Sequence, residues 1–178
     1  MSPVGHSSVA LLGWQKSTPN KNLKTLLLFL LISNLPDIDF LFSLFIGKKT
    51  AAIHQYYTHN IFFVCITALL FFPFLKQKKE RIGFFLVAFS HLLLDLLVID
   101  MVPPIGFRIF YPLSNQVFNF GIFPNMERDN LAAIFVLQNL WVLALEAAVF
   151  LVPVLLYYRK EFESYIKQKK FWELKCKS

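Results

Sequence analysis

Long runs of apolar side chains constrain this chain more than any other feature of its sequence. The runs at residues 82–102 and 131–158 hold 21 and 28 residues, and about 20 apolar residues in a helix cross the hydrocarbon core of a bilayer. Apolar residues make up 56% of the chain and charged residues 16%, so a soluble monomer would expose large apolar patches, which are rare. The composition excludes a disordered chain. The sequence therefore predicts an all-α membrane protein.

Two further apolar runs are shorter or interrupted. Residues 23–46 contain a polar segment around Pro36, and residues 61–75 need tilt or flanking residues to cross a bilayer. Counting all four runs, we expect a polytopic helical bundle of about four spans in residues 1–158, followed by a basic tail at 159–178. An apolar segment near the N-terminus is too short to span, and we expect it to form a half-inserted helix.

Basic residues fall mostly on one side of this four-span arrangement. All but four of the 18 lysines and arginines precede the first span, lie between the second and third, or follow the fourth. The positive-inside rule places that side and the tail in the cytoplasm, and the loops at 47–60 and 103–130 outside. Basic segments beside a membrane usually contact anionic lipid headgroups. We therefore expect membrane lipid as a partner and no nucleic acid.

Rare ionisable side chains interrupt the apolar runs. His91 and Asp95 are four residues apart in the third run, so on a helix they share one face. At a rise of about 1.5 Å per residue, Asp95 is expected roughly 10 Å below a helix end near Val102. Such residues are costly in a membrane and mark a functional site or an internal pair. Metal binding and a structural His–Asp pair both remain open.

Two other motifs also have two interpretations each. Asp37 and Asp39 follow Pro36, which interrupts the first run, and they either cap the helix that restarts there or share a cation. His54 and His59 lie in the loop before the second run. They are either solvated loop side chains or ligands that converge in a bent segment.

The motifs become more informative together. All four histidines and three of the five aspartates fall in them, and on the four-span topology they meet at the outer side, where His6 begins a short helix. Seven nitrogen and oxygen ligands exceed the four of one tetrahedral zinc and suit two ions about 3.5–4 Å apart. The cluster contains no cysteine, which favours a hydrolytic site over a structural zinc. The predicted metal ligands are His6, Asp37, Asp39, His54, His59, His91 and Asp95.

In order and spacing, these motifs resemble the YdjM-like family, described as LexA-binding, inner-membrane-associated metal-dependent hydrolases. That family is distantly similar to zinc-dependent phospholipases C and single-strand-specific zinc nucleases, so the resemblance implies a phospholipase C-like helical core, phosphoester hydrolysis and an inner-membrane location. The chain departs from the family pattern at Gln55 and Asn60. The resemblance rests on Gly5-His6, Leu-Pro-Asp-Ile-Asp (35–39), His54 and His59 with Thr58 between them, Ser-His-Leu-Leu-Leu-Asp (90–95) and Tyr-Pro-Leu-Ser (111–114).

The expected activity is that of a membrane-bound hydrolase with its site open to the outer face. Two zinc ions, or manganese, would activate a water. Asp39 or Asp95 would bridge the ions, and Asp37 would take the proton. The substrate would be a phosphoester or an amphipathic lipid that arrives from the bilayer edge. Three further residues are expected to support the ligands or the substrate: Thr58, Arg108 and Tyr111.

Two other functions compete with hydrolysis. An ion transporter or metal-binding protein would need polar side chains across the full membrane depth, for example Glu146 and Asp100. Residues 82–89, in the inner half of the third run, offer no such side chain, so transport is the weaker hypothesis. A helical scaffold with structural His–Asp pairs would bind no metal. For a repressor partner, which the family description suggests, the sequence offers only the basic tail, and whether the tail binds a partner stays open.

Overall fold

The described part of the chain is helical. Isolated β-bridges occur in it, but no named strand, which confirms the all-α prediction. The computed structural model describes residues 1–38, 57–99, 106–126, 136–161 and 163. Its α-helices are α1 (Pro3–Ser17), α2 (Leu23–Asn34), α4 (Ile61–Phe71), α5 (Lys78–Leu96) and α6 (Leu137–Glu146). Short 3-10 helices follow α2 (Leu35–Asp37) and α4 (Phe72–Phe74), and a π-helical turn (Ala147–Leu151) continues α6.

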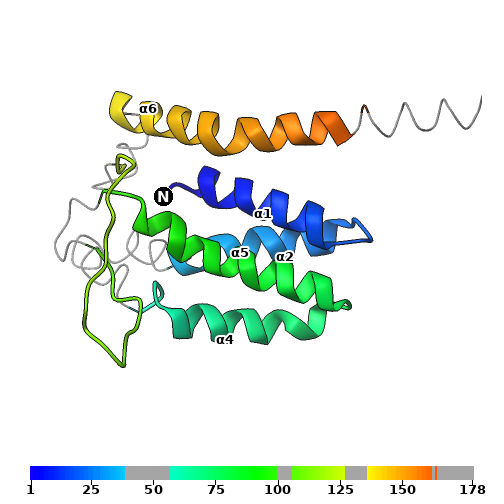
Figure 1. The fold of residues 1–178 in the computed structure, drawn as a ribbon, viewed down its shortest axis with the longest axis horizontal. Helices are drawn as coiled ribbons and strands as arrows, with labels where there is room; N and C mark the ends of the chain where they lie inside the picture. Colours follow the sequence, from blue (N-terminus) through cyan, green and yellow to red (C-terminus); the bar gives the residue numbers. More distant parts are fainter. Residues whose placement is uncertain (39–56, 100–105, 127–135, 162, 164–178) are drawn as a thin grey trace, which may run out of the picture.

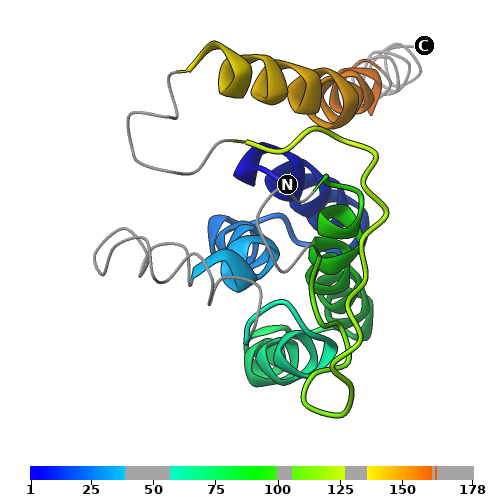
Figure 2. The ribbon, with the colours of Figure 1, turned by 90° about the vertical axis from the view of Figure 1, so that its left-hand side faces the viewer.

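The helices pack alongside one another as a bundle (Figure 1). Helix α1 packs against α2, α5 and α6, and α5 also packs against α2 and α4. Figure 2 shows α6 on the opposite side of α1 from α4. Two glycines allow helices α1 and α5 to approach closely. A Cβ at Gly13 would lie only 2.3 Å from the Val87 side chain, and a Cβ at Gly83 only 2.3 Å from the Ser17 side chain. The end of α1 therefore lies against the start of α5.

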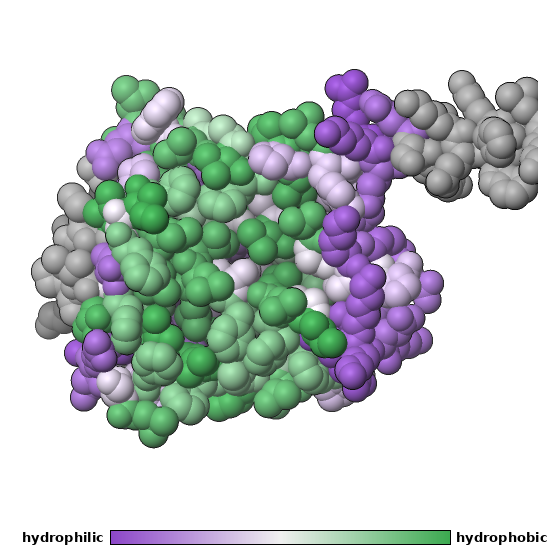
Figure 3. Space-filling model, viewed as in Figure 1, coloured by the Kyte–Doolittle hydropathy of each residue, from purple (hydrophilic) through white to green (hydrophobic). Residues whose placement is uncertain are grey.

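The surface of the bundle separates into an apolar body and a basic end. Figure 3 shows apolar residues over most of the visible face and hydrophilic residues gathered where α1 ends and α5 begins. Large apolar side chains are exposed on α2, α4 and α5, for example Leu27, Leu70 and Leu86. A continuous apolar surface of this kind suits contact with lipid or with another protein.

Side-chain caps fix where the helices begin. The side chains of Ser2, Asn22 and Asn60 each accept a hydrogen bond from a backbone N–H in the first turn of α1, α2 and α4. Such caps satisfy donors that a helix start leaves unpaired. At the start of α5, the Glu80 carboxylate accepts from the backbone N–H of Gln77 at 3.1 Å, which is the capping-box arrangement.

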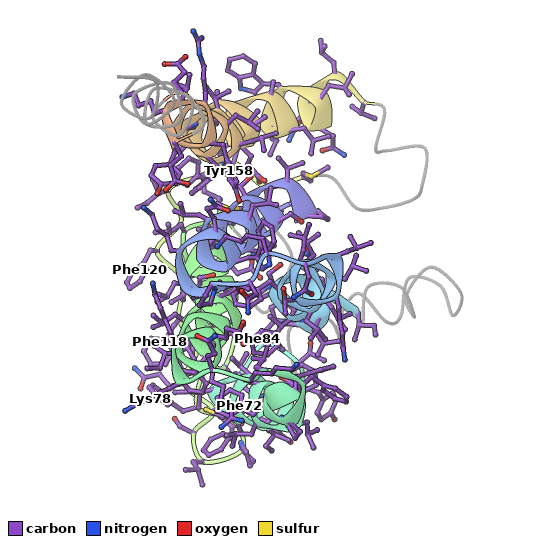
Figure 4. The ribbon with its side chains drawn as sticks, turned by 90° about the vertical axis from the view of Figure 1, so that its right-hand side faces the viewer. Phe72, Lys78, Phe84, Phe118, Phe120 and Tyr158 are labelled. Atoms are coloured by element: carbon purple, nitrogen blue, oxygen red, sulfur yellow. The ribbon has the colours of Figure 1, made fainter. Side chains whose placement is uncertain are left out.

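Aromatic and aliphatic side chains fill the interior. Phe29 of α2 and Phe84 of α5 are fully buried and meet edge to face, with ring centroids 5.3 Å apart. Figure 4 shows Phe84 directed between the helices and Lys78 directed away from them. On the other side of α1, the Tyr158 hydroxyl donates to the Leu11 carbonyl at 3.0 Å. This bond attaches the helix that continues α6 to α1.

The helix lengths support one of the four expected spans. Among the described residues, one helix, Leu137–Glu161, is long and apolar enough to cross a membrane. Helix α2 ends at Asn34, and the rest of the run at 23–46 lies outside the described residues beyond Ile38. The helix that covers 61–75 is short, with 3-10 geometry at its end. Four spans therefore remain a prediction.

The third run ends earlier than expected. Helix α5 stops at Leu96 rather than near Val102, because the segment at residues 120–123 supplies backbone donors to the carbonyls that a longer helix would use. The N–H of Phe120 donates to Leu96 at 2.8 Å, and those of residues 122 and 123 donate to Leu97 at 2.7 Å. Asp95 consequently lies in the last turn of the helix and not about 10 Å inside it, as the sequence suggested.

Candidate metal centre

Five ionisable side chains converge at one end of the bundle. His6 comes from the first turns of α1, Asp37 from the 3-10 helix after α2, His59 from the turn before α4, and His91 and Asp95 from α5. One ligand atom from each of the last four lies within 4.8 Å of the others. His6 joins them through Nε2, which is 3.2 Å from Asp95 Oδ1. We call these five residues the metal centre.

The two carboxylates lie between the imidazoles. Asp95 Oδ2 is 3.2 Å from His59 Nε2 and 3.1 Å from His91 Nε2. Asp37 Oδ1 is 3.3 Å from His59 Nε2 and 3.9 Å from His91 Nε2. The other oxygen of each carboxylate faces His6. His6 Nε2 lies 3.2 Å from Asp95 Oδ1 and 3.8 Å from Asp37 Oδ2. Each carboxylate thus presents one oxygen to the His59–His91 pair and the other to His6.

The backbone of α2 orients His91. Its Nδ1 lies 2.7 Å from the Ser33 carbonyl oxygen, which can only accept a hydrogen bond, so Nδ1 carries the proton. In the neutral ring, Nε2 then presents a lone pair toward the carboxylates and toward His59 Nε2, 3.3 Å away. A backbone carbonyl that fixes the tautomer of a histidine is typical of metal-binding imidazoles.

Local sequence places the remaining ligands. Pro36 follows the end of α2, and the 3-10 helix Leu35–Asp37 carries Asp37 to the histidines. The helix that Asp37 was predicted to cap lies outside the described residues. Gly5 leaves room for the residues around His6, because a Cβ there would lie 2.4 Å from Met1 Sδ and 3.3 Å from Glu146 Oε2. The predicted N-terminal helix is present as α1 and carries His6 to within 3.2 Å of Asp95, whereas the role of His6 as a metal ligand stays a prediction.

His6 and His91 stack nearly parallel, with ring centroids 3.9 Å apart and an interplanar angle of 16°. His6 is fully buried, and its Nδ1 has no hydrogen-bond partner among the described residues. The amino group of Met1 contacts Asp95 on the same side. The ring of His6 is therefore held by packing and leaves Nε2 directed at both carboxylates.

The pKa values of two of the histidines are shifted in opposite directions. Burial and the neighbouring His91 lower the pKa of His6 to about 4. Burial also lowers the pKa of His59, but hydrogen bonds to Asp37 and Asp95 and their charges outweigh it and raise the value to about 9. The carboxylates thus favour a positive charge at His59 Nε2. A divalent cation beside this nitrogen would supply that charge and leave the ring neutral.

The donor set fits a transition metal. With metal–ligand bonds of about 2.0–2.1 Å, neighbouring ligand atoms of a tetrahedral zinc lie about 3.3 Å apart. The separations among His59, His91 and Asp95 are 3.1–3.3 Å. Imidazole nitrogen and carboxylate oxygen are ligands for zinc and related ions. Asp37, His59, His91 and Asp95 could therefore hold a metal ion.

Five other residues were predicted to belong to the site or to support it, and the structure describes three of them. Asp39 and His54 lie outside the described residues. The Thr58 hydroxyl is 3.0 Å from His59 Nδ1, as a supporting residue would be. Tyr111 contacts Tyr57 edge to face, with centroids 6.0 Å apart.

Arg108 is half-buried and belongs to the same segment as Tyr111. This segment contacts the centre through Phe107, because the centroid of the Phe107 ring lies 5.9 Å from that of His59. The functional roles of Arg108 and Tyr111 stay predictions.

The sequence argument missed one close neighbour of the centre. Glu146 is buried and accepts hydrogen bonds from the Ser2 backbone N–H at 3.0 and 3.1 Å and from the Ser2 hydroxyl. An acidic residue inside the fourth apolar run was the available signal, because a buried carboxylate needs donors. Asp100, the other residue weighed for a transport path, lies outside the described residues.

Comparison with known proteins identifies a family. A family model described as YdjM inner membrane protein matches residues 1–163. Neither the curated proteins nor the solved structures provide a match to the chain. The similarity to zinc-dependent phospholipases C and zinc nucleases therefore stays a prediction.

Proposed function

The chain belongs to the YdjM inner membrane protein family, and on that premise we propose that it is a membrane-bound, metal-dependent phosphoester hydrolase. The observation that carries this proposal is the position of Asp37 and Asp95, each with one oxygen toward His59 and His91 and the other toward His6. Carboxylates that face two sets of ligands are suited to bridge two ions. A simple His–Asp pair would need neither the second carboxylate nor the third histidine.

Different residues would hold the two ions. His59 and His91 would bind one, and His6 the other, with both carboxylates shared. Asp39 and His54, predicted from the sequence, would complete the second position. Two divalent ions, zinc or manganese, would lower the pKa of a bound water to about 7 and stabilise charge on the phosphoryl group.

The protein side chains would orient the reaction. Ser33 holds His91 in one tautomer, and Thr58 supports His59. Asp37 would face the attacking water, since its side chain is 20% exposed while those of the three histidines are fully buried. Arg108 and Tyr111 would face the leaving part of the substrate, because their segment adjoins His59 through Phe107.

We place the metal centre toward the outer face of the membrane. The centre lies where α1 begins and α5 ends. Hydrophilic residues gather at the opposite end of these helices (Figure 3), where Lys16 lies in the last turn of α1 and Lys78 and Lys79 begin α5. The positive-inside rule then assigns the basic end and the tail to the cytoplasm. A four-span arrangement gives this orientation and uses α6 and its continuation as the last crossing.

Elemental analysis of the purified, full-length protein tests the proposal. We expect about two zinc or manganese ions per chain, their loss in His91→Ala, and their retention in Ser90→Ala. Ser90 is a matched control because it neighbours His91 but its hydroxyl donates to the Val87 carbonyl of its own helix, at 2.7 Å. A folded wild type that binds no stoichiometric metal after reconstitution contradicts the proposal. Bound metal without turnover of any phosphoester would overturn its hydrolase part and leave a metal-binding membrane protein.

A further inference from the structure

An apolar groove runs along α2 to the metal centre. It has a volume of about 570 Å³ and lies between the start of α1 and the outer side of α2. Leucine and isoleucine side chains form its walls, and polar groups gather at one end. Its walls include Leu27, Leu30, Leu31 and Ile38, and its polar end includes Asn34 and Asp37.

The groove and the metal centre share Asp37. This residue is a ligand of the centre and also lines the groove. The side chains of His6, His59 and His91 are fully buried and that of Asp95 is 5% exposed, whereas that of Asp37 is 20% exposed. Among the described ligands, Asp37 is therefore the one that a molecule in the groove can reach.

The length and position of the groove suit a hydrocarbon chain. Leu27 precedes Asn34 by seven residues, which is about 10 Å along a helix. Leu27 and Leu31 are 55% and 45% exposed and lie on the outer surface of the bundle, so a chain could enter sideways from a bilayer. The residues that line the groove carry no basic side chain, and a sugar or base would find few hydrogen-bond partners along its apolar walls.

The polar end suits the head of the same molecule. The Asn34 amide donates to the Ser7 hydroxyl at 3.2 Å and to the Leu30 carbonyl at 2.8 Å. Its buried Oδ1 has no hydrogen-bond partner among the described residues, so this oxygen can accept a hydrogen bond from a hydroxyl of the headgroup. Metal ions held by the centre would attract a phosphate beside Asp37. A molecule with a phosphate at one end and an aliphatic chain at the other matches both ends of the groove.

We propose that the substrate is a lipid phosphoester whose hydrocarbon chain lies in the α2 groove with its phosphate at the metal centre. This inference rests on the proposed hydrolase function and narrows its substrate class. A second apolar groove, between α1 and α5, gives an internal comparison. It is lined by Val9, Leu12 and Leu86 but includes Lys16 and Lys79 at the basic end, away from the centre.

Lipid binding distinguishes the two grooves. The metal-loaded, full-length protein is mixed with phosphatidic acid or with phosphatidylcholine of the same chains, and bound lipid is counted by native mass spectrometry. We expect preferential binding of phosphatidic acid that is lost in His91→Ala. Leu31→Trp, which fills the α2 groove, should weaken it by roughly tenfold, the effect of about two lost methylene contacts. Leu86→Trp is the matched control in the other groove and should leave binding unchanged.

Hydrolysis gives the second readout. In Leu31→Trp, kcat/KM for the long-chain phosphoester should fall roughly tenfold, while that for p-nitrophenyl phosphate should stay constant. Metal content equal to that of the wild type shows that the variant is folded. Loss of binding in Leu86→Trp but not in Leu31→Trp would overturn the proposal in favour of the lysine-lined groove. Equal effects of Leu31→Trp on both substrates, or none on either, would also overturn it. Failure of the wild type to hydrolyse either substrate would instead contradict the hydrolase function.

Discussion

Two buried carboxylates meet the first residues of α1, and the protein satisfies them in different ways. Glu146 accepts hydrogen bonds from the Ser2 backbone N–H and hydroxyl. It also benefits from the positive end of the α1 dipole. Asp95 faces three imidazoles and the amino group of Met1. One residue, Ser2, thus supplies the hydrogen bonds that Glu146 accepts, whereas Asp95 contacts several groups, three of them candidate metal ligands.

The partners of Glu146 are those of a structural carboxylate, whereas the partners of Asp95 are those of a candidate metal ligand. A buried carboxylate in an apolar protein needs donors, and the donors of one serine are enough for Glu146. Around Asp95, His91 already donates from Nδ1 to Ser33, so its Nε2 has a proton to offer only in the charged ring. The kind and number of partners, more than burial itself, distinguish Glu146 from Asp95, whose group of side chains could hold a metal ion.

Asp95→Asn should give the largest effect. The substitution keeps the size of the side chain but removes the charge and one acceptor oxygen that faces the histidines. We expect loss of both ions and a fall in phosphoester turnover of more than about 100-fold, because the metal-activated water is lost. Elemental analysis and a turnover assay on the same sample measure both. Retained metal would show that Asp95 is not shared between ions.

Gly5→Ala tests the turn where both acids meet. Alanine normally stabilises a helix relative to glycine by about 1 kcal/mol. At this position the added Cβ would lie 2.4 Å from Met1 Sδ and 3.3 Å from Glu146 Oε2. Overpacking of this kind costs about 1–3 kcal/mol, so we expect a net destabilisation and a lower Tm. A raised Tm would mean that Met1 and Glu146 can move away without cost.

Thr58→Val should weaken the centre without removing a ligand. Valine has the shape of threonine but lacks the hydroxyl that lies 3.0 Å from His59 Nδ1. Loss of a group that supports a ligand typically lowers metal affinity by about 10–100-fold, and we expect the lower end of that range. Competition with a fluorescent chelator measures the affinity. Thr67→Val is the control, because its hydroxyl bonds the Phe63 carbonyl within α4 at 2.7 Å.

Local patterns in the sequence predicted the parts of the centre that depend on nearby residues. The i, i+4 spacing of His91 and Asp95 placed both on one helix face, and Pro36 marked the interruption before Asp37. The end of α5 could not be predicted in this way, because its carbonyls are paired with a segment more than 20 residues later.

The contact of Glu146 with Ser2 spans 144 positions. No periodicity reports such a pairing, although the cost of a buried acid indicates that some partner must exist.

Glu146→Gln should have the smallest effect and completes the comparison with Asp95. Glutamine keeps one acceptor oxygen, but its amide nitrogen would face the donors of Ser2, and the charge at the start of α1 is lost. Loss of one buried hydrogen bond costs about 1 kcal/mol, so we expect a modest fall in Tm with metal content unchanged. Because Glu146 Oε2 also lies against Gly5, a change there could reach His6 through the backbone. Metal loss as complete as in Asp95→Asn would therefore assign Glu146 to the metal centre, whereas unchanged metal at reduced stability would confine its role to holding α6 against α1.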